Sequence, residues 1–364
     1  MLIREIIQCI EDLAPPVLQE AYDNVGLLIG NEQKKATAAI VCLDVTEKVI
    51  DEALEKKANL IISHHPLIFS GLKKITGTGM VDRCVAKAIK HDIVIYAAHT
   101  NIDNVQEGVN GMIAKKLGLQ NTQILVPAEN HLIKLVTFAP LNNASKIRQA
   151  LFEAGAGNIG NYDSCSFSTS GKGTFRGNDL SNPYVGKKGE MHTEEEERIE
   201  VIAPRYNKSR IIKALLSAHP YEEPAFDIFP LENAFASVGA GIIGWTNEKL
   251  SEEQWLKKIK DTFSLKILRH SELTGNTVSK IAVCGGAGSK FLKNTIAQGA
   301  QLFISSEFSY HSFFDADNKI VIVDIGHFES EQFTIELFYE LILKKIPNFA
   351  VHLTKVNTNP VNYF

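Results

Sequence analysis

Two adjacent histidines, His64 and His65, follow an apolar run that ends at Ser63. The run from Leu60 to Ser63 is typical of a buried strand, and open α/β sheets place their ligand-binding loops at the carboxyl ends of strands. Pro66 fixes an extended or turn conformation directly after the pair, so both imidazoles can serve neighbouring metals. The alternative is one structural and one exposed histidine.

Two further segments place a carboxylate four residues after a histidine, again where an apolar strand ends. His99 precedes Asp103 in the first segment, and His327 precedes Glu331 in the second. The spacing of four lets His327 and Glu331 share one face of a beginning helix. Mixed imidazole and carboxylate ligands suit zinc, iron or manganese, and two such metals bridged by an oxygen are a common hydrolytic arrangement. The clusters together predict a two-metal site.

Four other side chains are weaker candidates for a role in this site. Glu307 and His311 follow the run that ends at Ser305, and they are possible proton-transfer or substrate groups. Glu329 would point away from its neighbours His327 and Glu331, but it is also a possible proton carrier. Asp23 belongs to a polar turn and could support the ligands from behind, with a purely structural loop as the alternative.

Two other polar segments are interpreted as turns. Gly285 to Ser289 joins a strand to a helix but matches neither a Walker loop nor the full dinucleotide-binding spacing, which favours a tight turn over an anion site. His219 to Pro224 contains two prolines and an acidic pair, and it is assigned no catalytic role.

The elements that must position these residues are strands alternating with helices. Strand-like runs are Ala38 to Leu43, Leu60 to Ser63 and Ile93 to Ala98, with helices predicted after Thr46 and around Val81 to Ile89. This alternation is typical of an α/β layered fold.

The same alternation returns in the last third of the chain. Strands are predicted near Lys280 to Cys284, Leu302 to Ser305 and Lys319 to Ile325, followed by a helix through Leu337 and Leu341. The two parts also align residue against residue. An offset of 242 residues sets Ser63 against Ser305, and an offset of 228 sets His99 against His327 and Asp103 against Glu331.

Chance matches between apolar strands are common, but the shared histidine and carboxylate favour two similar α/β halves forming one metal-binding domain. We expect this domain to comprise residues 1–127 and 236–364.

The segment 128–235 has a different pattern and is predicted to be an insert domain. Its predicted order is strand 132–139, helix 144–154, strands near 163–167 and 173–176, strand 198–203, helix 209–218 and strand 225–230. The order βαββαβ is that of a ferredoxin-like fold. Arg176 to Glu197, rich in Gly, Pro, Asn and Glu, is predicted to be a solvated loop.

The composition of the chain argues against some binding partners and against a secreted protein. The chain of 364 residues is 45% hydrophobic and 22% charged, with a net charge of −4, which gives no basic field for nucleic acid or anionic membranes. The five cysteines form no CxxC pair and no short disulfide framework, which suggests a reducing compartment. Acidic residues interrupt the N-terminal apolar stretch, so we expect no signal peptide and a cytoplasmic protein.

Five motifs resemble those of the Nif-three-like family, whose members are catalogued as GTP cyclohydrolase I type 2 homologues. They are Tyr22 to Leu27, Leu43 to Thr46, Ser63 to Pro66, His99 to Asp103 and Gly326 to Glu331. The resemblance covers essentially the whole chain. Tyr162 to Phe167 and His219 to Pro224 are similar to the insert of longer bacterial members, which is related in fold to P-II and CutA signalling proteins.

The resemblance implies a ligand set and an assembly. Two divalent metals would be bound by His64, His65, Asp103, His327 and Glu331. His99 is not among the family's usual ligands and is expected to support them or to face the substrate. The subunits are expected to form a ring-shaped homohexamer, with the sites facing an inner cavity and the insert near the ring openings.

Two functions follow as hypotheses. In the first, the protein is a dinuclear metal-dependent hydrolase, a homologue of GTP cyclohydrolase I type 2, in which a metal-bound hydroxide attacks a small-molecule substrate. Glu307, Glu329 or His311 would carry protons. In the second, the protein binds metal or senses a metabolite through the insert without turnover.

Overall fold

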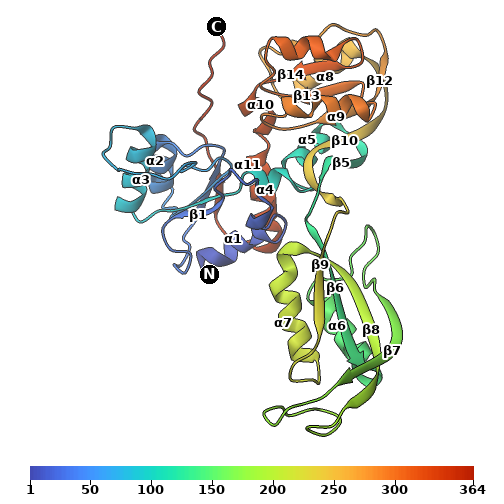
Figure 1. Ribbon diagram of the computed structural model, residues 1–364. Helices are drawn as coiled ribbons and strands as arrows, with labels where there is room; N and C mark the ends of the chain where they lie inside the picture. The colour runs from blue at the N-terminus through green and yellow to red at the C-terminus, as the bar shows by residue number, and fades with distance from the viewer. The chain divides into compact units, whose positions relative to one another are not determined.

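The computed structural model describes all 364 residues and divides into two compact units. Unit 1 contains Met1–Val126 and Ser237–Phe364, and unit 2 contains Pro127–Ala236. Figure 1 shows the ribbon, coloured from the N-terminus to the C-terminus. None of the helices is long and apolar enough to cross a membrane.

Unit 1 contains a first, mainly parallel sheet in the order β1-β4-β3-β2-β15. Its strands are β1 (Gly26–Ile29), β2 (Ala39–Cys42), β3 (Leu60–Ser63), β4 (Val94–Ala97) and β15 (Val351–Leu353), and only β1 runs antiparallel to its neighbour. Every residue of β2, β3 and β4 is buried, which explains their unbroken apolar runs.

Four helices pack against this sheet or against each other. They are α1 (Ile3–Glu11), α2 (Glu47–Glu55), α3 (Met80–Lys90) and α11 (Thr334–Lys345). Helix α2 contacts β2, β3 and α3, whereas α11 contacts β2, β15 and α1. Helix α11 and strand β15 both come from the end of the chain. C-terminal residues therefore complete the first sheet and cover part of it.

A second sheet of unit 1 has the order β11-β14-β13-β12-β10-β5. Its strands are β5 (Gln120–Ala128), β10 (Phe235–Ser251), β11 (Arg269–His270), β12 (Thr277–Val283), β13 (Leu302–Ser305) and β14 (Val321–Asp324). β12, β13 and β14 are parallel, and β11 is antiparallel to β14. The associated helices are α5 (Val109–Leu117), α8 (Glu252–Thr262) and α9 (Leu292–Ala297).

The strand register differs from the predicted alignment of the two sheets by one residue. Ser63 of β3 pairs with Ala97, and Ser305 of β13 pairs with Asp324, so β4 and β14 correspond at an offset of 227, not 228. His99 is the N-cap of the short helix α4 (Thr100–Asp103), whereas Gly326, with a φ of 89°, is the N-cap of α10 (His327–Glu331). His99 therefore corresponds to Gly326 rather than to His327.

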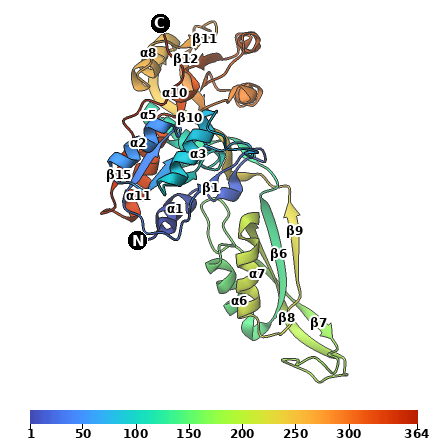
Figure 2. The same ribbon diagram turned by 90° about the vertical axis from the view of Figure 1, so that its left-hand side faces the viewer.

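Unit 2 is one antiparallel sheet with two helices. Its elements are β6 (Leu132–Pro140), α6 (Leu141–Glu153), β7 (Phe167–Phe175), β8 (His192–Pro204), α7 (Lys208–Ala218) and β9 (Phe226–Leu231). The strand order is β7-β8-β6-β9. Helices α6 and α7 lie side by side on one face (Figure 2), where Ile147, Leu151, Ile211 and Leu215 form a core with Leu135 and Val201.

Two sequence predictions in unit 2 are wrong. The strands expected near 163–167 and 173–176 are one strand, β7, which begins at Phe167. The acidic run Glu194 to Glu197, expected in a solvated loop, lies in β8 and pairs with β7. Acidic residues are poor strand formers in isolation, but pairing with β7, and for Glu196 and Glu197 also with β6, outweighs that preference.

Candidate metal centre

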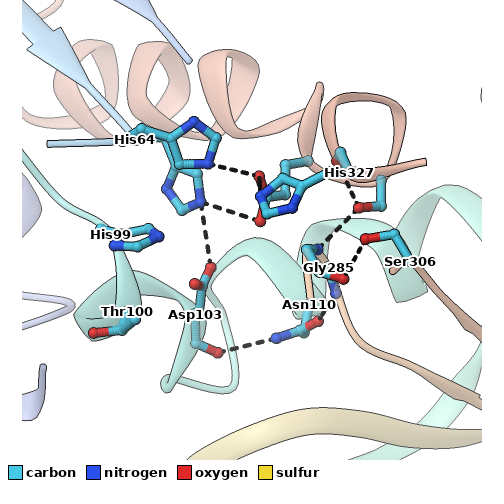
Figure 3. Close-up of polar contacts among 12 residues, drawn as sticks. His64, His99, Thr100, Asp103, Asn110, Gly285, Ser306 and His327 are labelled. Atoms are coloured by element: carbon cyan, nitrogen blue, oxygen red, sulfur yellow. Dashed lines mark hydrogen bonds and ion pairs between the residues drawn. The ribbon is translucent and has the colours of Figure 1, made fainter. Parts of the chain in front are cut away.

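Side chains from three strand ends meet in one cluster of unit 1 (Figure 3). His64 and His65 follow β3, Asp103 ends α4 after β4, and His327 and Glu331 belong to α10 after β14. All five predicted ligands contribute to groups whose donor atoms lie within 4.8 Å of one another. His99 completes a further group with His64 and His65.

The histidine rings of the cluster are held through their Nδ1 atoms. His64 Nδ1 lies 3.0 Å from the carbonyl oxygen of Ala98, and His65 Nδ1 lies 2.8 Å from Asp44 Oδ1. His327 Nδ1 lies 2.7 Å from Glu307 Oε1. Since these partners are acceptors, Nδ1 carries the proton and Nε2 points toward the other donor atoms.

Glu331 faces different histidines with its two oxygens. Its Oε2 lies 3.0 Å from His65 Nε2 and 3.1 Å from His327 Nε2. Its Oε1 lies 3.6 Å from His64 Nε2, which is also 3.7 Å from Asp103 Oδ1. One carboxylate thus joins two ligand sets.

Two buried polar atoms of the cluster lack a hydrogen-bond partner, His64 Nε2 and Asp103 Oδ1. The His64 side chain is 0% exposed, and burial lowers the pKa of His64 to about 4, so the ring is neutral at pH 7. Its Nε2 lone pair therefore faces the oxygens of Asp103 and Glu331 at distances too long for a hydrogen bond. Buried polar atoms that make no hydrogen bond are costly unless a cation lies between them.

The carboxylates and the other two rings have strongly shifted pKa values. Burial and the nearby Glu331 raise the pKa of Asp103 well above its ordinary value. Burial opposes ionisation of Glu331 too, but His64, His327 and His65 outweigh it and lower its pKa. Burial disfavours charged rings, yet hydrogen bonds to carboxylates raise the pKa of His65 to about 10 and that of His327 to about 9.

The residues fit divalent metal ions. A tetrahedral ion with ligands at about 2.1 Å separates two ligand atoms by roughly 3.4 Å. The 3.6 and 3.7 Å separations around His64 Nε2 are close to that value and too long for hydrogen bonds. Imidazole with carboxylate is a donor set for zinc, iron or manganese.

His99 and Asp23 form a connected pair beside the cluster. Asp23 Oδ1 lies 2.9 Å from His99 Nδ1, and Asp23 Oδ2 accepts from the backbone N–H of Thr100 at 3.0 Å. Burial opposes the charge on Asp23, but these hydrogen bonds lower its pKa below the ordinary range. The centroid of the His99 ring lies 5.2 Å from the centroid of the His64 ring and 5.4 Å from that of the His65 ring. Both residues lie beside the cluster, and the role predicted for them stays a prediction.

The three tentative proton carriers lie in different places. Glu307 contacts the metal cluster through His327, and its side chain is 55% exposed. Glu329 Oε1 instead accepts from Asn359 Nδ2 at 2.9 Å, on the C-terminal segment. The ring of His311 contacts Tyr310 and Phe314. Glu307 alone of the three touches a candidate ligand.

Sequence reasoning gave no role in the site to Asp44 or Gly286, although both lie in segments that it singled out. Asp44 holds His65, and its Oδ2 accepts from Thr358 Oγ1 at 2.8 Å. Asp44 follows β2, so the strand-end rule that found the histidines could have found it. Gly286, with a φ of 64°, packs so closely on Glu331 that a Cβ there would lie 2.3 Å from Glu331 Oε1. The turn at Gly285 to Ser289 is therefore part of the site wall.

Asn110 links the two strand-end regions that carry the ligands. Its Nδ2 donates to the carbonyl oxygen of Asp103 at 3.1 Å, and its Oδ1 accepts from the backbone N–H of Gly285 at 2.8 Å (Figure 3). This buried amide ties α4 to the loop after β12. The position of Asp103 thus depends on the second sheet as well as on the first.

Comparison with known proteins identifies the family. The model of the DUF34/NIF3 (NGG1p interacting factor 3) family matches residues 1–360. The chain belongs to the DUF34/NIF3 family. The resemblance predicted from the motifs is thereby confirmed.

Relatives of this DUF34/NIF3 chain match it along nearly its full length. A Halalkalibacterium halodurans protein named GTP cyclohydrolase 1 type 2 homolog is 38% identical over 98% of each chain. A Bacillus subtilis protein of the same name is 34% identical over 99% of this chain and 98% of its own. The crystal structure of a Bacillus cereus protein related to NIF3 is 37% identical, with a TM-score of 0.85, and covers 100% of this chain and 99% of its own. The mixed α/β fold with several sheets matches that structure.

Proposed function

We propose that this DUF34/NIF3 protein is a dinuclear, divalent-metal-dependent hydrolase. The observation that carries the proposal is the buried Nε2 atom of His64, which faces one oxygen of Asp103 and one of Glu331 without a hydrogen bond to either. The second oxygen of Glu331 faces His65 and His327. Two cations sharing one carboxylate would satisfy this arrangement.

The ligand sets divide between the oxygens of Glu331. One ion would be held by His64, Asp103 and Glu331 Oε1, and the other by His65, His327 and Glu331 Oε2. When bound, such ions polarise a substrate and lower the pKa of water to near neutrality. Zinc, iron and manganese all suit this donor set.

Glu307 and His99 are the chain's own groups for proton transfer and binding. Glu307 orients His327 through Nδ1, and its exposed carboxylate can accept a proton beside the centre. His99, held by Asp23, presents its other ring nitrogen for a substrate. Glu329 and His311 stay predictions without such a contact.

The test combines metal analysis with activity assays. Protein purified under reducing, chelator-free conditions is expected to hold about two divalent ions per subunit and to hydrolyse a member of a panel of GTP, phosphoesters and cyclic amides. GTP is included because the relatives are named GTP cyclohydrolase 1 type 2 homologs. Glu331→Gln, which preserves shape, should lose both metal and turnover.

Glu329→Gln is the matched control, since Glu329 lies in the same helix but contacts Asn359. It should keep its metal; a loss of turnover with metal retained would assign proton transfer to Glu329. Absence of stoichiometric metal in the wild-type protein would refute the dinuclear centre. Two bound metals without turnover across the panel would instead favour the second hypothesis, a metal-binding or metabolite-sensing protein.

Three architectural proposals accompany the functional one. The two sheets of unit 1 are similar halves, a proposal supported by the shared parallel order β4-β3-β2 and β14-β13-β12. Unit 2 is a ferredoxin-like insert domain, as its element and strand orders favour. The subunits form a homohexamer, for which multi-angle light scattering should give six times the 40.2 kDa subunit mass.

A further inference from the structure

A cavity of about 590 Å³ lies within unit 2. Its volume falls in the usual range of about 300–1,000 Å³ for small-molecule sites. The lining residues come from β7, β8 and the segments near Tyr184 and Tyr221. The cavity lies on the face of the sheet opposite α6 and α7, because the alternate residues Ile199 and Val201 of β8 join the helix-side core.

A buried carboxylate lines this cavity. Glu196 is 8% exposed, and its Oε1 accepts a hydrogen bond from the Tyr221 hydroxyl at 2.8 Å. No hydrogen bond to its Oε2 is present. Gly171 lies opposite Glu196 on β7, and a Cβ at the nearby Gly173 would lie 2.1 Å from Glu196 Oε2. The missing side chains of these glycines leave room for the carboxylate and for a ligand beside it.

Aromatic rings form a wall of the cavity. The Tyr221 ring centroid lies 6.1 Å from that of Phe175 and 6.2 Å from that of Tyr184, with interplanar angles of 55° and 51°. Tilted rings do not form the parallel slot that a flat base requires. They suit a compact cation, which the negative faces of aromatic rings attract.

The basic groups at the cavity do not cancel the buried negative charge. Arg198 Nε donates to Glu200 Oε1 at 2.9 Å, and its guanidinium lies over the ring of Phe138. Lys172 and Arg176 are exposed residues of the β7 end of the cavity. The buried charged group that remains for a ligand is therefore the Glu196 carboxylate.

We propose that this cavity binds a small organic amine as its primary ammonium ion. The ammonium group donates to Glu196 Oε2, and the carbon chain packs against Phe175, Tyr184 and Tyr221. The site is made only of unit 2 residues and uses no ligand of the metal centre. It would give the insert a ligand whether or not unit 1 turns over a substrate.

The probes are butylammonium, putrescine and 2-phenylethylammonium, each compared with the neutral alcohol of the same carbon skeleton. Calorimetric titration of the full chain should give saturable binding of at least one amine, with its alcohol at least about tenfold weaker. Glu196→Gln keeps the shape and the contact with Tyr221 but removes the charge. It should weaken amine binding at least about tenfold.

Glu195→Gln is the matched control, because Glu195 is the neighbouring, exposed residue on the other face of β8. It should bind the amine like the wild type. Gly173→Ala is a second test from the other strand, because its Cβ displaces Glu196 Oε2, and it should also weaken binding. Circular dichroism and metal content should be unchanged in all three variants.

Saturable amine binding that Glu196→Gln leaves intact would overturn the proposal, as would the absence of binding for every amine. Binding of inorganic phosphate without binding of amines would also overturn it, and would assign the cavity to its basic residues. Absence of metal from the wild-type protein would contradict the metal centre proposed for unit 1 but not the amine site proposed for unit 2. The two proposals can therefore be refuted independently.

Discussion

The histidines of the metal centre are oriented by acceptors behind them. Asp44 accepts from His65 Nδ1 and is itself held by Thr358 from the C-terminal segment. A carboxylate behind a ligating imidazole fixes the tautomer and makes Nε2 a stronger donor to a metal. Such partners affect metal affinity without touching the metal.

Replacement of Asp44 should therefore weaken metal binding. We expect Asp44→Asn to lower zinc affinity by about 10–100-fold, since removing such partners typically has an effect of this size. Competition with a chromophoric chelator measures it. Thr358→Val, which keeps the carboxylate on His65, should lower the affinity less. Equal affinity of Asp44→Asn and wild type would contradict the role given to Asp44.

Metal uptake should release protons near neutral pH. The raised pKa values of His65, about 10, and His327, about 9, mean that both rings carry a proton at pH 7 when no metal is bound. A ligating imidazole must be neutral, so binding displaces roughly two protons from these two rings, and affinity should rise from pH 7 to about pH 9. His64, with a pKa of about 4, contributes none in this range.

Titration calorimetry in buffers of different ionisation enthalpy measures the released protons. The chelator-treated protein should be used, so that both rings start protonated. An affinity that stays constant between pH 7 and 9, with no proton release, would contradict the assigned protonation states.

At the scale of elements, the short helices α4 and α10 begin where strands end and carry Asp103, His327 and Glu331, and the loop after β12 closes on Glu331. Gly286 of this loop lies against Glu331 and donates its backbone N–H to Ser330 Oγ at 2.9 Å. A side chain at this position must displace the Glu331 carboxylate. Position 286 thus requires glycine for two reasons: its φ is positive, and its backbone packs closely against Glu331.

Gly286→Ala should abolish stoichiometric metal binding, as measured by elemental analysis of the purified variant. Gly299→Ala is the matched control, because Gly299 also has a positive φ, 70°, but has nothing within 4 Å of its would-be Cβ. Both variants should lose roughly 1–2 kcal/mol of stability from backbone strain. Only Gly286→Ala should lose metal; retention of two ions in it would contradict the close-approach account.

At the scale of the whole molecule, the candidate metal ligands come from both sheets of unit 1. His65 and Glu331 are 266 residues apart and meet at 3.0 Å. Bound ions would therefore cross-link the two sheets. A ligand that binds only the folded state stabilises that state by about 4 kcal/mol when its free concentration is a thousand times its dissociation constant. Unit 2 contributes no ligand.

Metal removal should consequently loosen one unit only. After treatment with a chelator, peptides from α4 and α10 should exchange amide hydrogens faster, and the thermal midpoint of unit 1 should fall by several degrees. Peptides from α6 and α7 serve as the internal control and should be unchanged. Uniform acceleration over both units would argue against a metal confined to unit 1.

The sequence by itself determined the strand ends and the chemical types gathered there. Apolar runs such as Leu60 to Ser63 are fully buried in the structure, and a polar residue directly after such a run lies at the carboxyl end of a strand. These are local properties, so the α/β class and the polar clusters at the strand ends could be predicted from the residues. The choice of His64, His65, Asp103, His327 and Glu331 over His99 came from the resemblance to the family. The boundaries of β7 and β8 could not, because strand pairing overrode local preference.

Only the tertiary structure decided which atoms face one another. The one-residue difference in register separates His99 from its apparent counterpart His327, and it arises from hydrogen bonds between strands rather than from the order of residues. The division of Glu331 between two ligand sets, the support of His65 by Asp44, and the contact of Gly286 with Glu331 join residues distant in sequence. Such contacts depend on how the sheets pack, and packing is a property of the whole chain.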